Sequence, residues 1–145
     1  LYGHELSEAL SPIEAGLGYF VKVDKGEFTG RSALMKQKDE RPKKKIVAFK
    51  MNGKCPPPRQ GYEVYNNLES RKDVWSVANA GLKPQETDPV IGVVTSGTQS
   101  PSLSCGIGMA QVHIDRAREG AAIDISIRGK RYLATVCKKP LYKKQ

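Results

Sequence analysis

Apolar and polar positions alternate most regularly near the end of the chain, where Ile123, Ile125 and Ile127 are separated by polar residues. A period of two is typical of a β-strand with one face buried. The polar break Arg128-Gly129-Lys130 follows, and its glycine can adopt the positive φ that a short hairpin turn requires. The pattern therefore predicts a β-hairpin over 121–137.

The same reading along the chain predicts more strands. A β-branched run at 90–95 breaks into Ser, Thr, Gly and Pro and returns to apolar residues at 106–112. This is the pattern of a strand, a polar loop over 95–100 and a second strand, which we interpret as the lip of a small barrel. From residue 45 onward, six strands are predicted, at 45–51, 61–65, 90–95, 106–112, 121–128 and 131–137. Short strands with little room for crossover helices favour an antiparallel barrel or sandwich.

The first part of the chain is less regular. The aromatic and branched residues at 18–23 predict a strand, and helix formers at 31–38 predict one short amphipathic helix between Gly30 and Arg41-Pro42. We expect a leading segment over 1–42 and a β-barrel domain over 43–145. Residues 66–89, which include the only tryptophan, Trp75, are too long for a plain hairpin. They are expected to be an insertion that is functional or partly mobile. The apolar run around Trp75 is also compatible with an extra strand pair or a short helix.

Composition narrows the class of protein. A chain of 145 residues with 39% hydrophobic and 27% charged residues suits one folded domain rather than a disordered chain. No apolar run approaches the roughly 18 residues that span a bilayer, and no signal peptide opens the chain, so we expect a soluble intracellular protein. The three cysteines lack paired metal spacing and are expected to be reduced thiols.

Candidate catalytic chemistry is sparse. His4 and His113 have no metal-ligand spacing, and neither is expected to have an acidic partner. Glu14 is expected to cap a turn. The segment contains no recognisable nucleophile, metal site or phosphate-binding loop, so no catalytic residue is assigned.

The net charge of +9 suits an anionic partner. Basic residues cluster at 41–45 and 138–144, either as solvated strand ends or as a rim that faces an anion. A basic barrel that binds nucleic acid without catalysis remains an alternative. It would require the tyrosines to line one exposed basic face, namely Tyr19, Tyr62, Tyr65, Tyr132 and Tyr142.

Several short motifs occur in a familiar order. They are LYGHEL at 1–6, SPIEAGLG at 11–18, FTGRSAL at 28–34, GVVTSGT at 92–98, SPSL at 100–103, GIGMA at 106–110, RGK at 128–130 and KPLY at 139–142. Together they resemble the C-terminal portion of the aminomethyltransferase family, the T protein of the glycine cleavage system. The resemblance covers the chain except for 66–89.

This resemblance implies a six-stranded antiparallel C-terminal barrel and a transferase reaction. Members of the family take an aminomethyl group from the lipoyl arm of a carrier protein, pass the methylene to tetrahydrofolate and release ammonia. The resemblance implies that folate is bound mainly by an N-terminal part that is missing here, and that the leading segment over 1–42 is the end of that folate-binding region. The segment alone is therefore expected to be inactive. A dimethylglycine- or sarcosine-oxidising folate enzyme, which has a similar C-terminal region, is the alternative.

Two binding residues are carried over from the resemblance. Arg59 follows the stiff run Pro56-Pro57-Pro58, where the family places an arginine. Lys144 lies where many members have an arginine in the tail near the folate glutamate; it keeps the charge but lacks the planar fork. The implied partners are the lipoyl carrier protein and the N-terminal domain, with no role for a membrane or for nucleic acid. The implied location is the cytoplasm, or the mitochondrion in a eukaryote.

Overall fold

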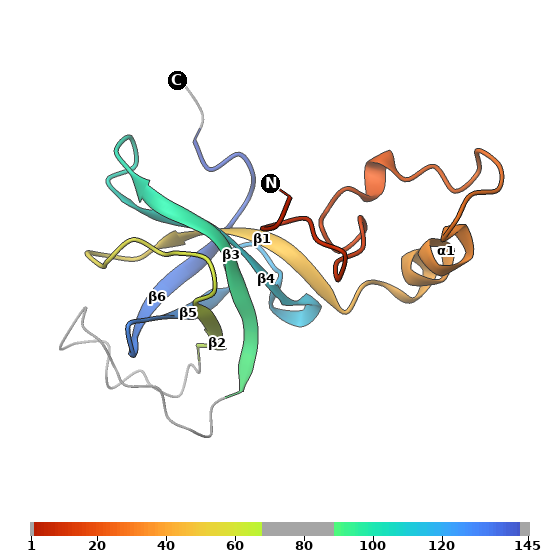
Figure 1. The fold of residues 1–145 in the computed structure, drawn as a ribbon. Coiled ribbons are helices and arrows are strands. Elements are labelled where there is room, and N and C mark those ends of the chain that lie inside the picture. Colours follow the sequence, from red (N-terminus) through yellow and green to blue (C-terminus); the bar gives the residue numbers. More distant parts are fainter. Residues whose placement is uncertain (1, 68–88, 143–145) are drawn as a thin grey trace.

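The computed structural model describes residues 2–67 and 89–142. Figure 1 shows a β-barrel from which a leading segment projects to one side. The predicted insertion at 66–89 falls outside the described residues from 68 to 88, so its expected mobility remains a prediction. Among the described residues, no helix has the length and apolar content needed to cross a membrane.

The barrel is closed by six antiparallel strands of the described chain, in the order β1-β4-β3-β2-β5-β6. This confirms the predicted mainly β, six-stranded fold. Five of the observed strands begin and end within a few residues of the predicted bounds. The exception is β3, which extends past the predicted end at residue 95 to Ser100. The strands are β1 (Lys44–Met51), β2 (Glu63–Asn66), β3 (Val90–Ser100), β4 (Cys105–His113), β5 (Ala122–Ile127) and β6 (Lys130–Cys137).

The interior is filled by alternate residues of each strand. On β5, Ile123, Ile125 and Ile127 are fully buried, as their alternation predicts. On β4 the buried positions are small, and Phe49 of β1 lies opposite Gly108. A Cβ on Gly108 would lie 2.6 Å from the Phe49 ring, far inside van der Waals contact, so the glycine provides the space in which the phenylalanine packs.

The predicted loop at 95–100 is wrong. These residues continue β3 to Ser100, where Ser100 pairs with Cys105 of β4, and the turn occupies 101–104. The register shifts between Val94 and Ser96, which is the mark of a β-bulge. Polar, glycine-rich residues are tolerated here because β4 satisfies their backbone groups, so local composition does not end the strand.

The leading segment consists mainly of turns, with a 3-10 turn, η1 (Gly18–Phe20), and one helix, α1 (Arg31–Glu40). The helix confirms the prediction at 31–38. The strand predicted at 18–23 is wrong, because none of the described strands lies beside this segment to pair with its backbone. Glu14 caps a turn as expected: its N–H donates to Ser11 Oγ at 3.1 Å, and its carboxylate accepts from the Ser11 N–H at 3.2 Å.

Candidate functional site

The connection between β1 and β2 lies against the β3–β4 hairpin. We call residues 52–62 the proline loop. Pro58 is fully buried although it belongs to a loop. A Cβ on Gly97 would lie 2.7 Å from the Pro58 carbonyl oxygen, and one on Gly106 would lie 2.9 Å from Pro58 Cδ. Pro58 therefore fits between Gly97 and Gly106 only because neither residue has a side chain; we call this pair the glycine cradle.

Arg59 is positioned by this packing. Its guanidinium is exposed, and one NH1 proton is donated to the carbonyl oxygen of Gly97 at 3.1 Å. Because the preceding Pro58 is held in the glycine cradle, the backbone of Arg59 is anchored while its side chain stays at the surface. This leaves other guanidinium donors directed to solvent, as an anion contact requires. Lys144, the second predicted binding residue, lies outside the described residues, so the two cannot be related in space.

A second group of side chains joins the leading segment to the barrel, and we call it the seam: His4, Glu5, Gln60, Thr95 and Ser96. The Glu5 carboxylate accepts hydrogen bonds from Thr95 Oγ1 at 2.9 Å and Ser96 Oγ at 2.5 Å. His4 Nδ1 donates to the Thr95 carbonyl oxygen at 3.1 Å, and Gln60 Nε2 donates to the Gly3 carbonyl oxygen at 3.0 Å. The seam thus connects the leading segment to both β3 and the proline loop.

The seam is built on the β3 bulge. The extra residue turns the hydroxyls of Thr95 and Ser96 toward one carboxylate, although neighbouring strand residues normally face opposite sides. Burial raises the pKa of Glu5, but the hydrogen bonds that it accepts, among them those from Ser96 and Thr95, lower it more, to about 2. The carboxylate is therefore ionised at neutral pH.

A basic residue from the C-terminal segment completes this region. Burial lowers the pKa of Lys139, the Glu5 carboxylate opposes that effect, and the Lys45 ammonium adds to it. Lys139 therefore feels the charges of both Glu5 of the leading segment and Lys45 of β1.

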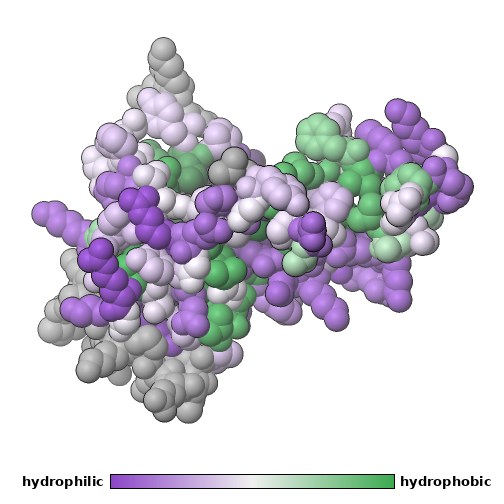
Figure 2. Space-filling model, in the orientation of Figure 1, coloured by the Kyte–Doolittle hydropathy of each residue, from purple (hydrophilic) through white to green (hydrophobic). Residues whose placement is uncertain are grey.

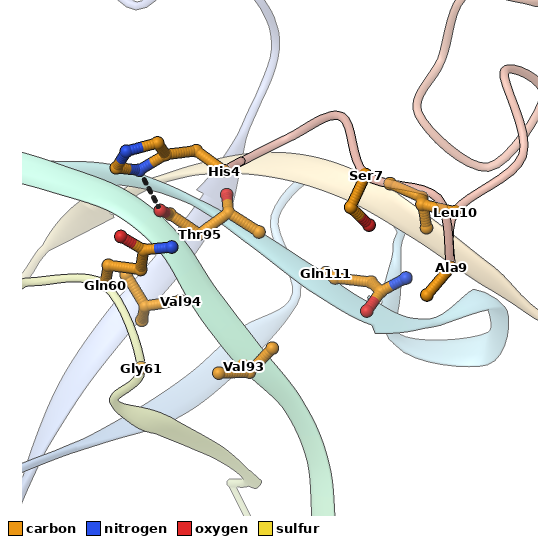
Figure 3. Close-up of a pocket in the computed structure, with 10 residues that line it drawn as sticks. All are labelled: His4, Ser7, Ala9, Leu10, Gln60, Gly61, Val93, Val94, Thr95 and Gln111. Atoms are coloured by element: carbon orange, nitrogen blue, oxygen red, sulfur yellow. Dashed lines mark hydrogen bonds between the residues drawn. The ribbon is translucent and has the colours of Figure 1, made fainter. Parts of the chain in front are cut away.

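Beside the seam lies a half-open hollow of about 210 Å³. Figure 3 shows His4, Gln60 and Thr95 at one side and Gln111 of β4 at the other. Its polar groups are neutral amides, hydroxyls and an imidazole, which can orient a ligand but do not form a nucleophile–base pair.

Other predicted residues fall outside this region. His113 Nδ1 lies 3.1 Å from Asp115 Oδ2, so the expectation of no acidic partner is wrong: Asp115 was overlooked although it lies only two residues ahead. Within the described ranges, no three His, Cys, Asp or Glu side chains gather as metal ligands. Cys55, Cys105 and Cys137 are free thiols.

The tyrosines do not form the face that nucleic-acid binding would require. Tyr65 is only 7% exposed, and the Arg131 guanidinium stacks 3.8 Å from its ring centre. Tyr62 and Tyr132 pack against the apolar core, whereas Tyr19 lies on the leading segment. Of the five tyrosines, only Tyr19 and Tyr142 are exposed, so the five do not line one exposed face as that alternative requires.

Sequence reasoning missed the seam. Glu5 and Ser96 are 91 positions apart, and nothing in their local patterns links them. The available signal was indirect: both residues belong to motifs that carry the family resemblance, LYGHEL at 1–6 and GVVTSGT at 92–98.

Comparison with known proteins places these features in context. Residues 44–143 match the family described as "Glycine cleavage T-protein C-terminal barrel domain". An aminomethyltransferase from Alkaliphilus oremlandii is 43% identical over 144 residues, which cover 98% of this chain and 33% of that protein. One from Caldanaerobacter subterraneus is 42% identical, over 99% of this chain and 33% of that protein. The chain thus spans about a third of the length of these relatives.

A solved structure has the same fold. The crystal structure of glycine cleavage system aminomethyltransferase T from Bartonella henselae superposes with a TM-score of 0.76 at 24% identity, over 98% of this chain and 35% of that one. The family match covers the whole barrel, from the start of β1 past the end of β6. The chain belongs to the glycine cleavage T-protein C-terminal barrel domain family.

Proposed function

We propose that this chain is the C-terminal part of a tetrahydrofolate-dependent aminomethyltransferase of the glycine cleavage system. In the proposed reaction, the methylene of an aminomethyl group on a lipoyl carrier protein passes to tetrahydrofolate, and ammonia is released. The observation that carries the proposal is similarity along the leading segment as well as the barrel, since 98% of the chain aligns with an aminomethyltransferase at 43% identity. These relatives are bacterial, and we propose a cytoplasmic location.

The contribution of this part of the enzyme is to bind and orient. The carboxylate of Glu5 is held by two hydroxyls, and Glu14 caps a turn, so neither is placed to move a proton to or from a substrate. The catalytic groups are proposed to belong to the part of the enzyme that this chain does not span. The barrel then supplies a fixed surface against which folate is enclosed.

Arg59 is the proposed folate contact. The glutamate tail of tetrahydrofolate carries carboxylates, and a guanidinium binds a carboxylate through two parallel hydrogen bonds. The side chain of Arg59 is exposed and oriented by its bond to the Gly97 carbonyl oxygen, so little conformational entropy remains to be lost on binding. Such a contact contributes on the order of 1.5–3 kcal/mol. Lys144 is proposed as an additional charge near the same carboxylates.

The test uses this chain joined to the upstream two-thirds of the Alkaliphilus oremlandii aminomethyltransferase. Arg59→Ala should weaken tetrahydrofolate binding about ten-fold or more, as measured by calorimetry, and Arg59→Lys should recover only part of the loss. Arg118→Ala is the matched control. Arg118 is also exposed, but it follows the C-terminal end of β4, whereas Gly97, which holds Arg59, pairs with Gly108 near the start of β4. Unchanged folate affinity in Arg59→Ala would contradict the proposed contact between Arg59 and folate.

The reaction itself is tested by single turnover with aminomethylated carrier and tetrahydrofolate. The joined protein should produce ammonia and methylene-tetrahydrofolate, whereas the 145-residue chain alone should produce neither. Turnover by the chain alone would contradict the assignment of the catalytic groups to the upstream part.

A further inference from the structure

Two of the three free cysteines lie at the same end of the barrel. Cys55 belongs to the proline loop, and Cys105 is the first residue of β4. Figure 1 shows the β3–β4 hairpin and the proline loop at this end, and Figure 2 shows a mainly polar surface there with apolar atoms recessed in it. Both cysteines are partly buried, so each is held by the fold and is still open to a small reagent.

The packing of the proline loop keeps Cys55 near the start of β4. A Cβ on Gly106 would lie 2.7 Å from Met51 Cγ and 2.9 Å from Pro58 Cδ, so the stretch that contains Cys55 meets the same glycine before and after it. Cys105 directly precedes Gly106. Only three residues separate Cys55 from Pro58 along the chain, and three residues span at most about 11 Å. The two cysteines are therefore held in one corner of the fold.

The electrostatics of Cys55 agree with this placement. Burial first, and then the neighbouring Cys105, raise the pKa of the Cys55 thiol, and a like charge acts on a pKa chiefly at short range. The third cysteine, Cys137, lies elsewhere: it pairs with Ala48 of β1, and its thiol donates to the Thr135 carbonyl oxygen at 3.3 Å. The fold thus brings one pair of thiols together and keeps the third apart.

We propose that Cys55 and Cys105 form a reversible disulfide, which ties the proline loop to the start of β4 when the chain meets a small-molecule disulfide such as oxidised glutathione. One protein thiolate attacks a sulfur of the reagent and releases one glutathione thiolate, which leaves a mixed disulfide. The second protein thiolate attacks the protein sulfur of that bond and releases the other glutathione. The protein loses two protons and two electrons, and the reagent is reduced to two thiols.

The bond holds the loop that carries Arg59 at a second point. Pro58 already anchors this loop in the glycine cradle, and a disulfide at Cys55 limits the freedom of the residues between them. The bond also joins positions about 50 residues apart, which lowers the conformational entropy of the unfolded chain. The oxidised chain should therefore resist urea better than the reduced chain.

The first test oxidises the reduced 145-residue chain with oxidised glutathione, blocks the remaining thiols with iodoacetamide and maps the peptides by mass spectrometry. The Cys55 and Cys105 peptides should be joined, and Cys137 should be alkylated. Cys137→Ser is the matched control and should form the same bond, whereas Cys55→Ser and Cys105→Ser should form no disulfide within the chain. A bond to Cys137 in the folded wild type would overturn the proposal. So would glutathione left on Cys55 or Cys105 with no bond between them.

Urea denaturation supplies a second readout, which depends on the geometry of the pair. The midpoint of unfolding should lie about 1 M or more higher in the oxidised chain than in the reduced chain, and dithiothreitol should abolish the difference. Cys137→Ser should show the same shift, and Cys55→Ser none. An equal or lower midpoint in the oxidised wild type would refute the proposal, because the native fold would then hold the two sulfurs outside disulfide geometry. The inference does not rest on the proposed function, so a folate affinity unchanged by Arg59→Ala would leave it standing.

Discussion

Gly97→Ala tests the packing that places Arg59. A Cβ at this position would lie 2.7 Å from the Pro58 carbonyl oxygen and 2.9 Å from Pro58 Cγ, whereas ordinary contact begins near 3.4 Å. Pro58 would have to move by about 0.7 Å to restore contact. It cannot retreat freely, because it is fully buried and also packs against the position of Gly106.

The expected cost follows from these distances. Forcing a methyl group into a closely packed site costs about 1–3 kcal/mol. Alanine restricts the unfolded chain more than glycine does, which offsets about 0.5–1 kcal/mol. The free energy of unfolding should therefore fall by about 1–2 kcal/mol. Gly18→Ala is the matched control, because no atom lies within 4 Å of its added Cβ, so it should be neutral or stabilising by up to about 1 kcal/mol.

Urea denaturation of both variants, followed by circular dichroism, measures the difference. We expect the two free energies of unfolding to differ by about 2 kcal/mol, with equal dependence on urea concentration. Equal stability of the two variants would refute the close approach of Pro58 to Gly97. It would also remove the physical basis for an anchored Arg59.

Two further predictions concern ionisable groups. Glu5→Gln should lower the free energy of unfolding at pH 7 by about 1 kcal/mol, because the charge-assisted hydrogen bonds of this partly buried carboxylate are partly screened by solvent. The pKa of Glu5 falls from 4.5 to about 2 on folding, so the stabilisation is present above pH 4.5 and is lost as the pH falls through 2. Urea titrations of the wild type and the variant should therefore give equal free energies of unfolding near pH 2. A difference in free energy that stays constant with pH would contradict this reasoning. Burial first, and then the neighbouring Cys105, raise the pKa of the Cys55 thiol, so iodoacetamide at pH 8 should label Cys55 more slowly in the folded chain than in urea, as read by mass spectrometry; equal rates would show that the thiol is open to solvent.

Much of the barrel could be predicted from local patterns. The alternation of isoleucines in β5 marks its buried face, and the turn after it has the positive φ expected at Gly129, 75°. The positive φ of 52° at Arg128 was not expected. The helix at Arg31–Glu40 also follows from residues without glycine or proline. These features depend on secondary-structure propensities and on the period of apolar positions over a few neighbouring residues, and both can be read from the sequence.

Local patterns misled where neighbouring segments decide the outcome. Residues 95–100 have the composition of a loop but extend β3, because β4 pairs with them up to Ser100. Residues 18–23 have the composition of a strand but form η1 and irregular structure, because no strand in the described part of the chain pairs with them. Strand formation requires a partner for the backbone hydrogen bonds, and the identity of that partner is not a local property.

By itself the sequence determined the β-rich class, the approximate positions of the six barrel strands, and, through motifs in order, the family and the candidate Arg59. Only the tertiary structure decided the strand order, the burial of Pro58 between two glycines, and the contact of Glu5 with hydroxyls some 90 positions away. The physical reason is that packing and hydrogen bonding depend on distance in space, whereas periodicity and propensity act between neighbours along the chain.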